Sequence, residues 1–324
     1  MKTTFYPFEL HCHTVHSDGK MPPDTLIEAA VRDGLTGVAL TDHNAVSGLD
    51  EAERIAGRKG VVFLRGIEWT TFYGHITVLG AESVVDWRSV NPDSVVECVR
   101  NVRASGGIAG IAHPYRIGYP ICTGGSDDWG LGNDYGAFSH YEVWSYLSPQ
   151  KNPTNRMAKN RYYELIAAGN RLACVYGRDR HTDYDEGKAY AVTFVGVEGA
   201  PDARSVYQAI ARGRTYVSTG VTVDLALERE GATYEIGSEV PCGECRLRIG
   251  ASLWRKAYTD RFGVSIDGVR LLTEEGERFF PIKAGEREEI PLSLSGRYLG
   301  VEVEGTIEGE RGTLAVVTPF FVKS

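Results

Sequence analysis

The chain has 324 residues, 42% of them hydrophobic and 24% charged, a balance typical of a globular protein with one large domain and a smaller one, or two moderate ones. The formal net charge of −8 disfavours binding to nucleic-acid backbones, although it leaves room for a local basic pocket. No segment has the roughly 20 apolar residues that span a bilayer, and the N-terminus lacks the apolar stretch of a signal peptide, so we expect a cytoplasmic protein without a membrane partner.

Short apolar runs alternate with helical stretches over the first two thirds of the chain. The pattern predicts strands at residues 8–10, 36–40, 61–64, 108–112, 141–144 and 172–176, and helices at residues 23–33, 49–57, 94–104, 161–168 and 202–211. Repeated strand–helix units indicate a parallel α/β arrangement that is closed or nearly closed. We assign residues 1–215 to this α/β domain.

The pattern changes after Arg214. Residues 221–227, 246–249 and 301–304 alternate in polarity, glycine turns separate them, and helix signals fade. We expect residues 216–324 to form a smaller antiparallel β-domain, for which a sandwich is one architecture. Cys242 and Cys245 form a CxxC pair there, which we interpret as coincidental, because a zinc site needs two more ligands and no histidine follows His181.

Residue types that bind metal ions stand at the ends of the predicted strands. They are six histidines and four carboxylates: His11, His13, His43, His75, His113, His181, Asp18, Asp42, Glu68 and Asp179. The carboxyl ends of parallel strands converge on one mouth, so we expect these side chains to meet. Imidazole and carboxylate ligands together suit Zn²⁺, Mn²⁺ or Fe, and their number predicts two or three divalent ions.

These motifs resemble the PHP (polymerase and histidinol phosphatase) superfamily of metal-dependent phosphoesterases. The resemblance rests on His11-Cys12-His13, Ser17-Asp18-Gly19, Thr41-Asp42-His43-Asn44, Gly66-Ile67-Glu68, Gly74-His75, Ala112-His113-Pro114 and Gly177-Arg178-Asp179-Arg180-His181, in that order. Residues 213–218, followed by a β-domain, are similar to the branch of carbaryl-hydrolase-like metallohydrolases. The resemblance implies that residues 1–215 form a distorted seven-stranded (β/α) barrel with up to three metal ions.

The resemblance also implies which side chains hold each ion. The sets are His11, His13, Glu68 and Asp179 for the first ion, Glu68, His75 and His113 for the second, and Asp18, His43 and His181 for the third. Glu68 would bridge the first two ions. Asp42, beside His43, is expected to orient an imidazole.

The loop after His113 carries predicted substrate-binding residues. Arg116 suits two-pronged contact with phosphate oxygens, with a surface arginine as the alternative. Tyr115, with Tyr119, Trp129 and Tyr135, could line a pocket for a flat group. The alternative is a surface loop with incidental aromatic residues.

Four residues keep open or minor assignments. Arg178 stands where similar proteins carry a small serine, and it either reaches an anionic substrate or points to solvent. His16 either helps to bind substrate or is merely exposed. We expect His140 to be a satisfied core or edge histidine. Glu142 alternates with apolar residues and could face the mouth, and no role is assigned to it.

The expected activity is hydrolysis of a small phosphoester by a hydroxide that bridges two ions, with Glu68, Asp42 and Arg116 as the catalytic set. Arg116 and Arg178 favour phosphate over the alternative, a carboxylic or carbamate ester or an amide, which needs an apolar pocket and an oxyanion site. A binding module with purely structural metals is a further class. It is disfavoured because structural sites are closed and this chain has surplus ligands. The sequence leaves the oligomeric state open.

Overall fold

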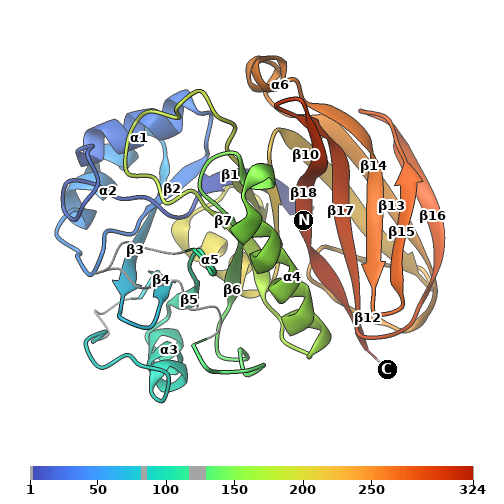
Figure 1. Ribbon diagram of the computed structural model, residues 1–324, viewed down its shortest axis with the longest axis horizontal. Coiled ribbons are helices and arrows are strands. Elements are labelled where there is room, and N and C mark those ends of the chain that lie inside the picture. The colour runs from blue at the N-terminus through green and yellow to red at the C-terminus, as the bar shows by residue number, and fades with distance from the viewer. Residues whose placement is uncertain (1–2, 82–85, 117–128, 324) are drawn as a thin grey trace.

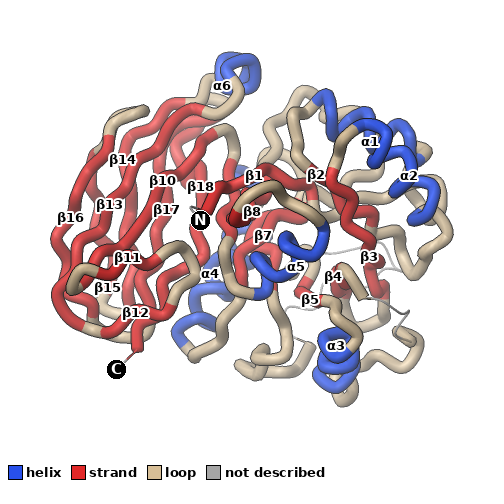
Figure 2. The backbone as a smooth tube through the Cα atoms, turned by 180° about the vertical axis from the view of Figure 1, so that it is seen from behind, coloured by secondary structure: helices blue, strands red, loops and turns tan. Residues whose placement is uncertain are grey.

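A computed structural model describes residues 3–81, 86–116 and 129–323 of the chain. Figure 1 shows two regions side by side, one in which helices surround strands and one built almost wholly of strands. Figure 2 shows the same division from behind, with α1 to α3 on one side and β10 to β18 on the other. None of the helices in these ranges is long and apolar enough to cross a membrane.

The first region alternates strands and helices, as predicted. Its strands are β1 (Thr3–Glu9), β2 (Gly37–Leu40), β3 (Val62–Thr70), β4 (His75–Leu79), β5 (Ile108–Ile111), β6 (His140–Ser145), β7 (Ala173–Gly177), β8 (Val192–Glu198) and β9 (Thr215–Ser218). Its helices are α1 (Pro23–Arg32), α2 (Leu49–Lys59), α3 (Val95–Ala104), α4 (Pro153–Ala167) and α5 (Ala203–Ala211), with a 3-10 turn at Pro149–Lys151.

Helix α4 and strands β4, β8 and β9 differ from the sequence prediction. Helix α4 begins at Pro153, eight residues before the predicted start, because proline fits the first helical turn and the Asn152 side chain caps the backbone N–H of Thr154. Strand β4 was not predicted. It pairs with an extension of β3, so that His75 lies opposite Thr70.

The strands of this region form one continuous path with mixed directions. β1, β2 and β3 are parallel neighbours, as are β5, β6 and β7, whereas β4 runs antiparallel between β3 and β5. β8 and β9 continue the path beyond β1 in antiparallel fashion. The parallel arrangement is therefore confirmed for two groups of three strands and is wrong for β4.

Strand β7, at one end of this path, lies close to β8 and to β18. The backbone N–H of Tyr176 in β7 donates to the Thr193 hydroxyl of β8 at 2.9 Å, and that of Cys174 donates to the Thr318 hydroxyl at 2.9 Å. Within the described ranges no backbone ladder joins β7 to β8 or β9. The fold is thus mixed α/β with a large sheet, while a closed seven-stranded barrel is not shown and stays a prediction.

The second region contains the remaining strands of the described residues. They are β10 (Val221–Arg229), β11 (Ala232–Tyr234), β12 (Glu239–Pro241), β13 (Gly243–Leu253), β14 (Ser265–Thr273), β15 (Gly276–Pro281), β16 (Arg287–Leu294), β17 (Tyr298–Ile307) and β18 (Glu310–Lys323), with one helix, α6 (Lys256–Phe262). Strands β11, β10, β13 and β16 make a separate four-stranded antiparallel sheet. The others extend the large sheet through the pairing of β18 with β9.

The two sheets of the second region share one hydrophobic cluster. Buried residues such as Leu225 and Ile249 of the small sheet belong to the same cluster as Val301 and Val316 of the large one. Such a shared core is typical of sheets packed face to face. Because β9 pairs with both β8 and β18, the large sheet is continuous across residue 215, and the division into two domains there stays a prediction.

Candidate metal centre

The strand topology brings the predicted ligands to one edge of the sheet. His11 and His13 follow β1, and His43 follows β2, at the carboxyl ends of parallel strands. Strand β4 runs the opposite way, so its first residue, His75, lies at the edge where β3 ends at Thr70. The N-terminal end of β4 and the C-terminal ends of β1 and β2 therefore lie together at this edge.

Backbone pairing then sets which way these side chains point. An isolated β-bridge joins the segment after β1 to the segment after β7, with the His13 N–H donating to Arg180 O at 2.8 Å and the Arg180 N–H donating to His11 O at 3.2 Å. Alternate residues of extended segments share a face. Asp179 and His181, on either side of Arg180, therefore face the same way as His11 and His13.

Glu68 stands at the middle of the assembly and is fully buried. Its Oε2 atom lies 3.1 Å from His11 Nε2, 3.2 Å from His13 Nε2 and 2.9 Å from His43 Nδ1. Its Oε1 atom lies 2.9 Å from His75 Nδ1 and 2.8 Å from the Nε2 atom of a fifth imidazole, that of His113. One carboxylate thus joins two sets of imidazoles, each facing a different oxygen.

Asp179 completes the group on the Oε2 side. Its Oδ1 atom lies 3.1 Å from His13 Nε2 and 3.7 Å from His11 Nε2. One donor atom each from His11, His13, Glu68 and Asp179 can be chosen so that all lie within 4.8 Å of one another. This is the first ligand set that the family resemblance implied. A donor atom of His43, one of Glu68 and one of His75 make a further compact group.

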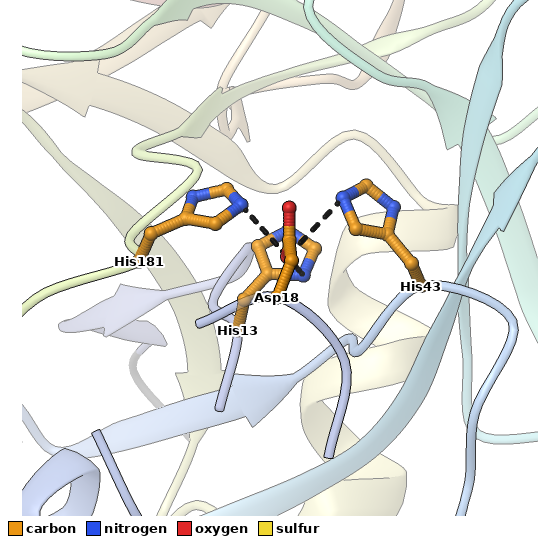
Figure 3. Close-up of side chains that lie close together, drawn as sticks. All are labelled: His13, Asp18, His43 and His181. Atoms are coloured by element: carbon orange, nitrogen blue, oxygen red, sulfur yellow. Dashed lines mark ion pairs between the residues drawn. The ribbon is translucent and has the colours of Figure 1, made fainter. Parts of the chain in front are cut away.

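A more exposed group forms around Asp18, as Figure 3 shows. Asp18 Oδ1 lies 3.1 Å from His181 Nε2, 3.6 Å from His43 Nε2 and 4.0 Å from His13 Nδ1. Gly19 is required for this approach, because a β-carbon there would lie 2.5 Å from the backbone carbonyl of His13. The implied third set of Asp18, His43 and His181 is therefore brought together, with His13 as an additional neighbour.

Electrostatics couple these groups strongly. Burial acts to raise the pKa of Glu68, but the surrounding imidazoles, His11 foremost, hold it well below its usual range. Burial acts to lower the pKa of His11, yet the carboxylates around it, Glu68 foremost, raise it well above the usual range. Burial also acts to lower the pKa of His181, but the hydrogen bond to Asp18 raises it to about 9. Without a metal ion, protons on the imidazoles balance the buried carboxylates, and a cation could replace them.

The donor atoms fit a divalent cation. Glu68 Oε2, Asp179 Oδ1 and His13 Nδ1 are buried and lack a hydrogen-bond partner among the described residues. Buried polar atoms without a partner are costly. An ion beside Glu68 Oε2 and Asp179 Oδ1 would satisfy both, and an ion beside Asp18 could satisfy His13 Nδ1. The mixture of imidazole nitrogen and carboxylate oxygen suits Zn²⁺, Mn²⁺ or Fe.

The predicted substrate-binding residues have mixed outcomes. Arg116 lies beside the cluster, where its guanidinium forms an ion pair with Asp179 and stacks 4.7 Å from the ring centre of Tyr146. Tyr115, which follows Pro114, is half-buried and packs against the core. A role of either in substrate binding stays a prediction.

Arg178 is buried beside two carboxylates. Its side chain is 3% exposed, with Nη1 lying 3.6 Å from Asp33 and 3.8 Å from Glu9, and its guanidinium stacks 4.3 Å from the ring centre of Tyr190. It lies on the opposite side of its segment from Asp179, because adjacent residues of an extended chain point to opposite faces. The expectation that Arg178 points to solvent is therefore wrong, and its contact with substrate stays a prediction.

The aromatic residues of the long loop are also placed differently from the expectation. Trp129 and Tyr135 are buried in the core rather than open to a pocket. Tyr119 lies outside the described residues.

His16 is partly exposed and interacts with the Ser47 hydroxyl, at 2.9 Å.

His140 is the satisfied core histidine that the sequence predicted. Its Nε2 atom lies 2.9 Å from the Thr77 hydroxyl, and its Nδ1 atom lies 2.8 Å from the Ser139 hydroxyl. Burial lowers its pKa to about 3, so the ring is neutral.

Asp42 organises a loop instead of an imidazole. Its carboxylate accepts hydrogen bonds from the backbone N–H and the hydroxyl of Thr14, at 2.7 and 2.6 Å, and from the Ser17 hydroxyl at 2.6 Å. No contact with an imidazole is found for it among the described residues. Asp42 therefore shapes the loop that carries Asp18, and its assignment to the catalytic set stays a prediction.

Sequence reasoning left Glu142 without a role, yet it touches the cluster directly. Its Oε1 atom lies 2.8 Å from His11 Nδ1, and its Oε2 atom accepts a hydrogen bond from the His113 backbone N–H at 2.6 Å. The one sequence signal for this position was the alternation of Glu142 with apolar residues in β6. The two residues that it contacts, His11 and His113, are 131 and 29 positions away in the sequence.

Comparison with known proteins gives a family match over the same residues. The family model described as the PHP domain matches residues 9–180. The chain is 35% identical over 112 residues to a 3',5'-nucleoside bisphosphate phosphatase of Chromobacterium violaceum, a match that covers 32% of this chain and 39% of that protein. It is 39% identical over 64 residues to a 5'-3' exoribonuclease of Haemophilus influenzae, covering 20% of this chain and 23% of that protein. The matches thus span less than half of either relative.

A solved structure resembles the whole chain. It is a two-domain protein from Bacteroides vulgatus that contains a predicted PHP-like metal-dependent phosphoesterase. The TM-score is 0.53 at 16% sequence identity, and the alignment covers 97% of this chain and 95% of that one. The likeness at this identity concerns the fold, and it includes the strand-rich second region.

Proposed function

Because this chain belongs to the PHP domain family, we propose that it is a metal-dependent hydrolase that cleaves a small phosphoester. The observation that carries the proposal is the position of Glu68, a fully buried carboxylate with imidazole nitrogens within 3.2 Å of both oxygens. A buried carboxylate surrounded in this way is suited to bridging two cations.

The proposed ligands are the three sets that the family resemblance implies. The first ion would be held by His11, His13, Glu68 and Asp179, the second by Glu68, His75 and His113, and the third by Asp18, His43 and His181. Two or three such ions would acidify a water molecule and offset the charge that develops on a phosphate ester. Zn²⁺, Mn²⁺ and Fe all suit this donor set.

The remaining residues would orient the ligands and the substrate. Asp42 would hold the Asp18 loop through Thr14 and Ser17. Arg116, which in this structure forms an ion pair with Asp179, would turn to an incoming phosphate group and bind its oxygens in two-pronged fashion. With the metal ions on one side and the Arg116 guanidinium on the other, the charge of the phosphate group would be neutralised and the group oriented for attack.

Two relatives indicate the range of substrates to consider. One is named as a phosphatase of nucleoside bisphosphates and one as an exoribonuclease, so a nucleotide or a nucleic-acid end is a candidate beside simpler phosphoesters. A small molecule agrees better with the net charge of −8. Neither relative name supports the carboxylic or carbamate ester alternative.

The architecture enters the proposal at two points. We infer that residues 1–215 form a distorted seven-stranded (β/α) barrel whose rim carries the ligands. We also infer that residues 216–324 act as a separate antiparallel β-domain. The cytoplasmic location expected from the sequence belongs to the same proposal.

The test is a combined metal and substrate assay. Protein expressed with added Zn²⁺, Mn²⁺ or Fe is analysed for bound metal, then offered phosphomonoesters, nucleoside bisphosphates, short oligoribonucleotides and aryl carboxylic esters. We expect at least two ions per chain and phosphoester hydrolysis that chelation abolishes. Glu68→Gln serves as the inactive control. One ion or none, or cleavage of carboxylic esters alone, would overturn the proposal.

A further inference from the structure

Glu142 is a buried carboxylate that touches the candidate metal centre without belonging to it. It lies in β6 and is 2% exposed, and it is absent from the three groups of donor atoms found among the described residues. Its two oxygens are already occupied, Oε1 by His11 Nδ1 at 2.8 Å and Oε2 by the His113 backbone N–H at 2.6 Å. These contacts identify a residue that acts on the proposed ligands rather than on an ion.

The contact with His11 selects one form of the imidazole. A carboxylate accepts hydrogen bonds, so the proton of a neutral His11 ring is held on Nδ1. The unprotonated Nε2 atom then faces Glu68 Oε2 at 3.1 Å and His13 Nε2 at 3.1 Å. This is the form that can donate a lone pair to a cation in the first group.

The contact with His113 holds a strained part of the backbone. His113 has a φ angle of +26°, a conformation that residues with a side chain rarely adopt. The carboxylate of Glu142 accepts the hydrogen bond of its N–H, while the imidazole of the same residue lies 2.8 Å from Glu68 Oε1. Glu142 therefore supports one imidazole of each proposed ligand set that shares Glu68, His11 in the first set and His113 in the second.

Strand β7 leaves room for this carboxylate. A β-carbon at Gly177 would lie 2.1 to 2.2 Å from the carboxylate atoms of Glu142. Even the smallest side chain at that position would therefore push Glu142 away from His11. Gly177 lies in β7 and Glu142 in the adjacent strand β6, so the absence of a side chain at Gly177 leaves the space that the carboxylate fills.

We propose that Glu142 is a positioning residue that holds His11 in its metal-binding tautomer and fixes His113, and so raises the metal affinity of the two groups that share Glu68. The inference rests on the proposed metal-dependent function. Partners of metal ligands typically change affinity by about 10- to 100-fold when they are replaced.

The experiment compares Glu142→Gln with Glu9→Gln. Glu9 is a fitting control because it is also buried, lies two residues before His11, and makes no side-chain hydrogen bond within the described part of the chain. An amide can accept from only one of the two donors, and its NH₂ group favours the other tautomer of His11, with a proton on Nε2. Zn²⁺ and Mn²⁺ dissociation constants are measured by competition with a chelator.

We expect Glu142→Gln to bind metal about 10- to 100-fold more weakly than wild type, and Glu9→Gln to bind it normally. Nitrogen chemical shifts of His11 in the Zn²⁺-loaded protein should show a protonated Nδ1 with a strong hydrogen bond in wild type and a weaker hydrogen bond in Glu142→Gln. Gly177→Ala, which displaces the carboxylate without removing it, should weaken metal binding in the same direction. Excess metal should restore much of kcat in both variants.

The outcomes separate this inference from the proposed function. If wild type binds metal and Glu142→Gln binds it equally well with an unchanged His11 Nδ1–H signal, the positioning role is overturned and the function stands. If wild type binds no metal, the function and this inference both fall.

Discussion

Arg116 forms an ion pair with Asp179, so a candidate substrate-binding cation is held by a candidate metal ligand. This pairing makes Arg116→Ala informative. We expect kcat/KM for phosphoesters to fall roughly 10- to 150-fold, the range of a lost charge-assisted hydrogen bond, while bound metal is unchanged. Arg246→Ala, which removes an exposed arginine from β13, serves as the control. Normal turnover in Arg116→Ala would mean that the phosphate is bound elsewhere.

A substitution at Glu68 tests the bridge between the two buried groups. Glu68→Gln keeps the size of the side chain but removes the charge that two cations would share. We expect it to lose at least one ion per chain and to reduce kcat/KM by at least about 100-fold. Elemental analysis together with an activity assay provides the measurement. Wild-type metal content and turnover in this variant would refute the bridging assignment.

Asp18 tests whether the exposed group binds an ion independently. Its side chain is 58% exposed, whereas Glu68 is fully buried, so we expect Asp18→Asn to lose only the ion of the third group. The number of ions per chain should fall by about one relative to wild type, while the buried groups keep their ions. Loss of two or more ions in Asp18→Asn would show that the groups bind metal as a single unit.

His140 should make the stability of the protein depend on pH. Burial lowers its folded-state pKa to about 3, from an unfolded value of 6.5. Below pH 6.5 the unfolded chain binds a proton that the folded protein excludes, so stability is lost as the pH falls from about 6.5 toward 3. Between about pH 7.5 and about pH 5, His140 should lower the free energy of unfolding by about 2 kcal/mol.

The measurement is urea unfolding of metal-free protein at those two pH values. His140→Gln keeps a polar group between Thr77 and Ser139 but cannot titrate, so its loss of stability should be smaller than that of wild type by about this amount. His16→Gln removes a partly exposed histidine and should behave like wild type. An unchanged pH dependence in His140→Gln would contradict the expected burial effect.

Much of the candidate site could be predicted from local sequence pattern. His11 and His13 are separated by one residue after a strand, and that spacing alone predicts that they share a face. His113 and Asp179 follow apolar runs of strand length, which places them at strand ends before any pairing is known. The match of the PHP domain model to residues 9–180 confirms the family that these motifs resembled.

Other features depended on which strands became neighbours. His75 reaches the cluster because β4 runs antiparallel to β3, and no local pattern distinguished that direction. Arg178 turned away from the site because its face of the segment after β7 meets Glu9 and Asp33 in the interior.

The same limit explains why Glu142 was left unassigned. Its sequence neighbours indicate a strand residue, but its partner His11 lies 131 positions away. Local spacing determines which residues end a strand and which face they take, because backbone geometry repeats over a few residues. Which buried carboxylate meets which imidazole is decided only when β6 packs within reach of β1, since long-range contacts form through the tertiary structure.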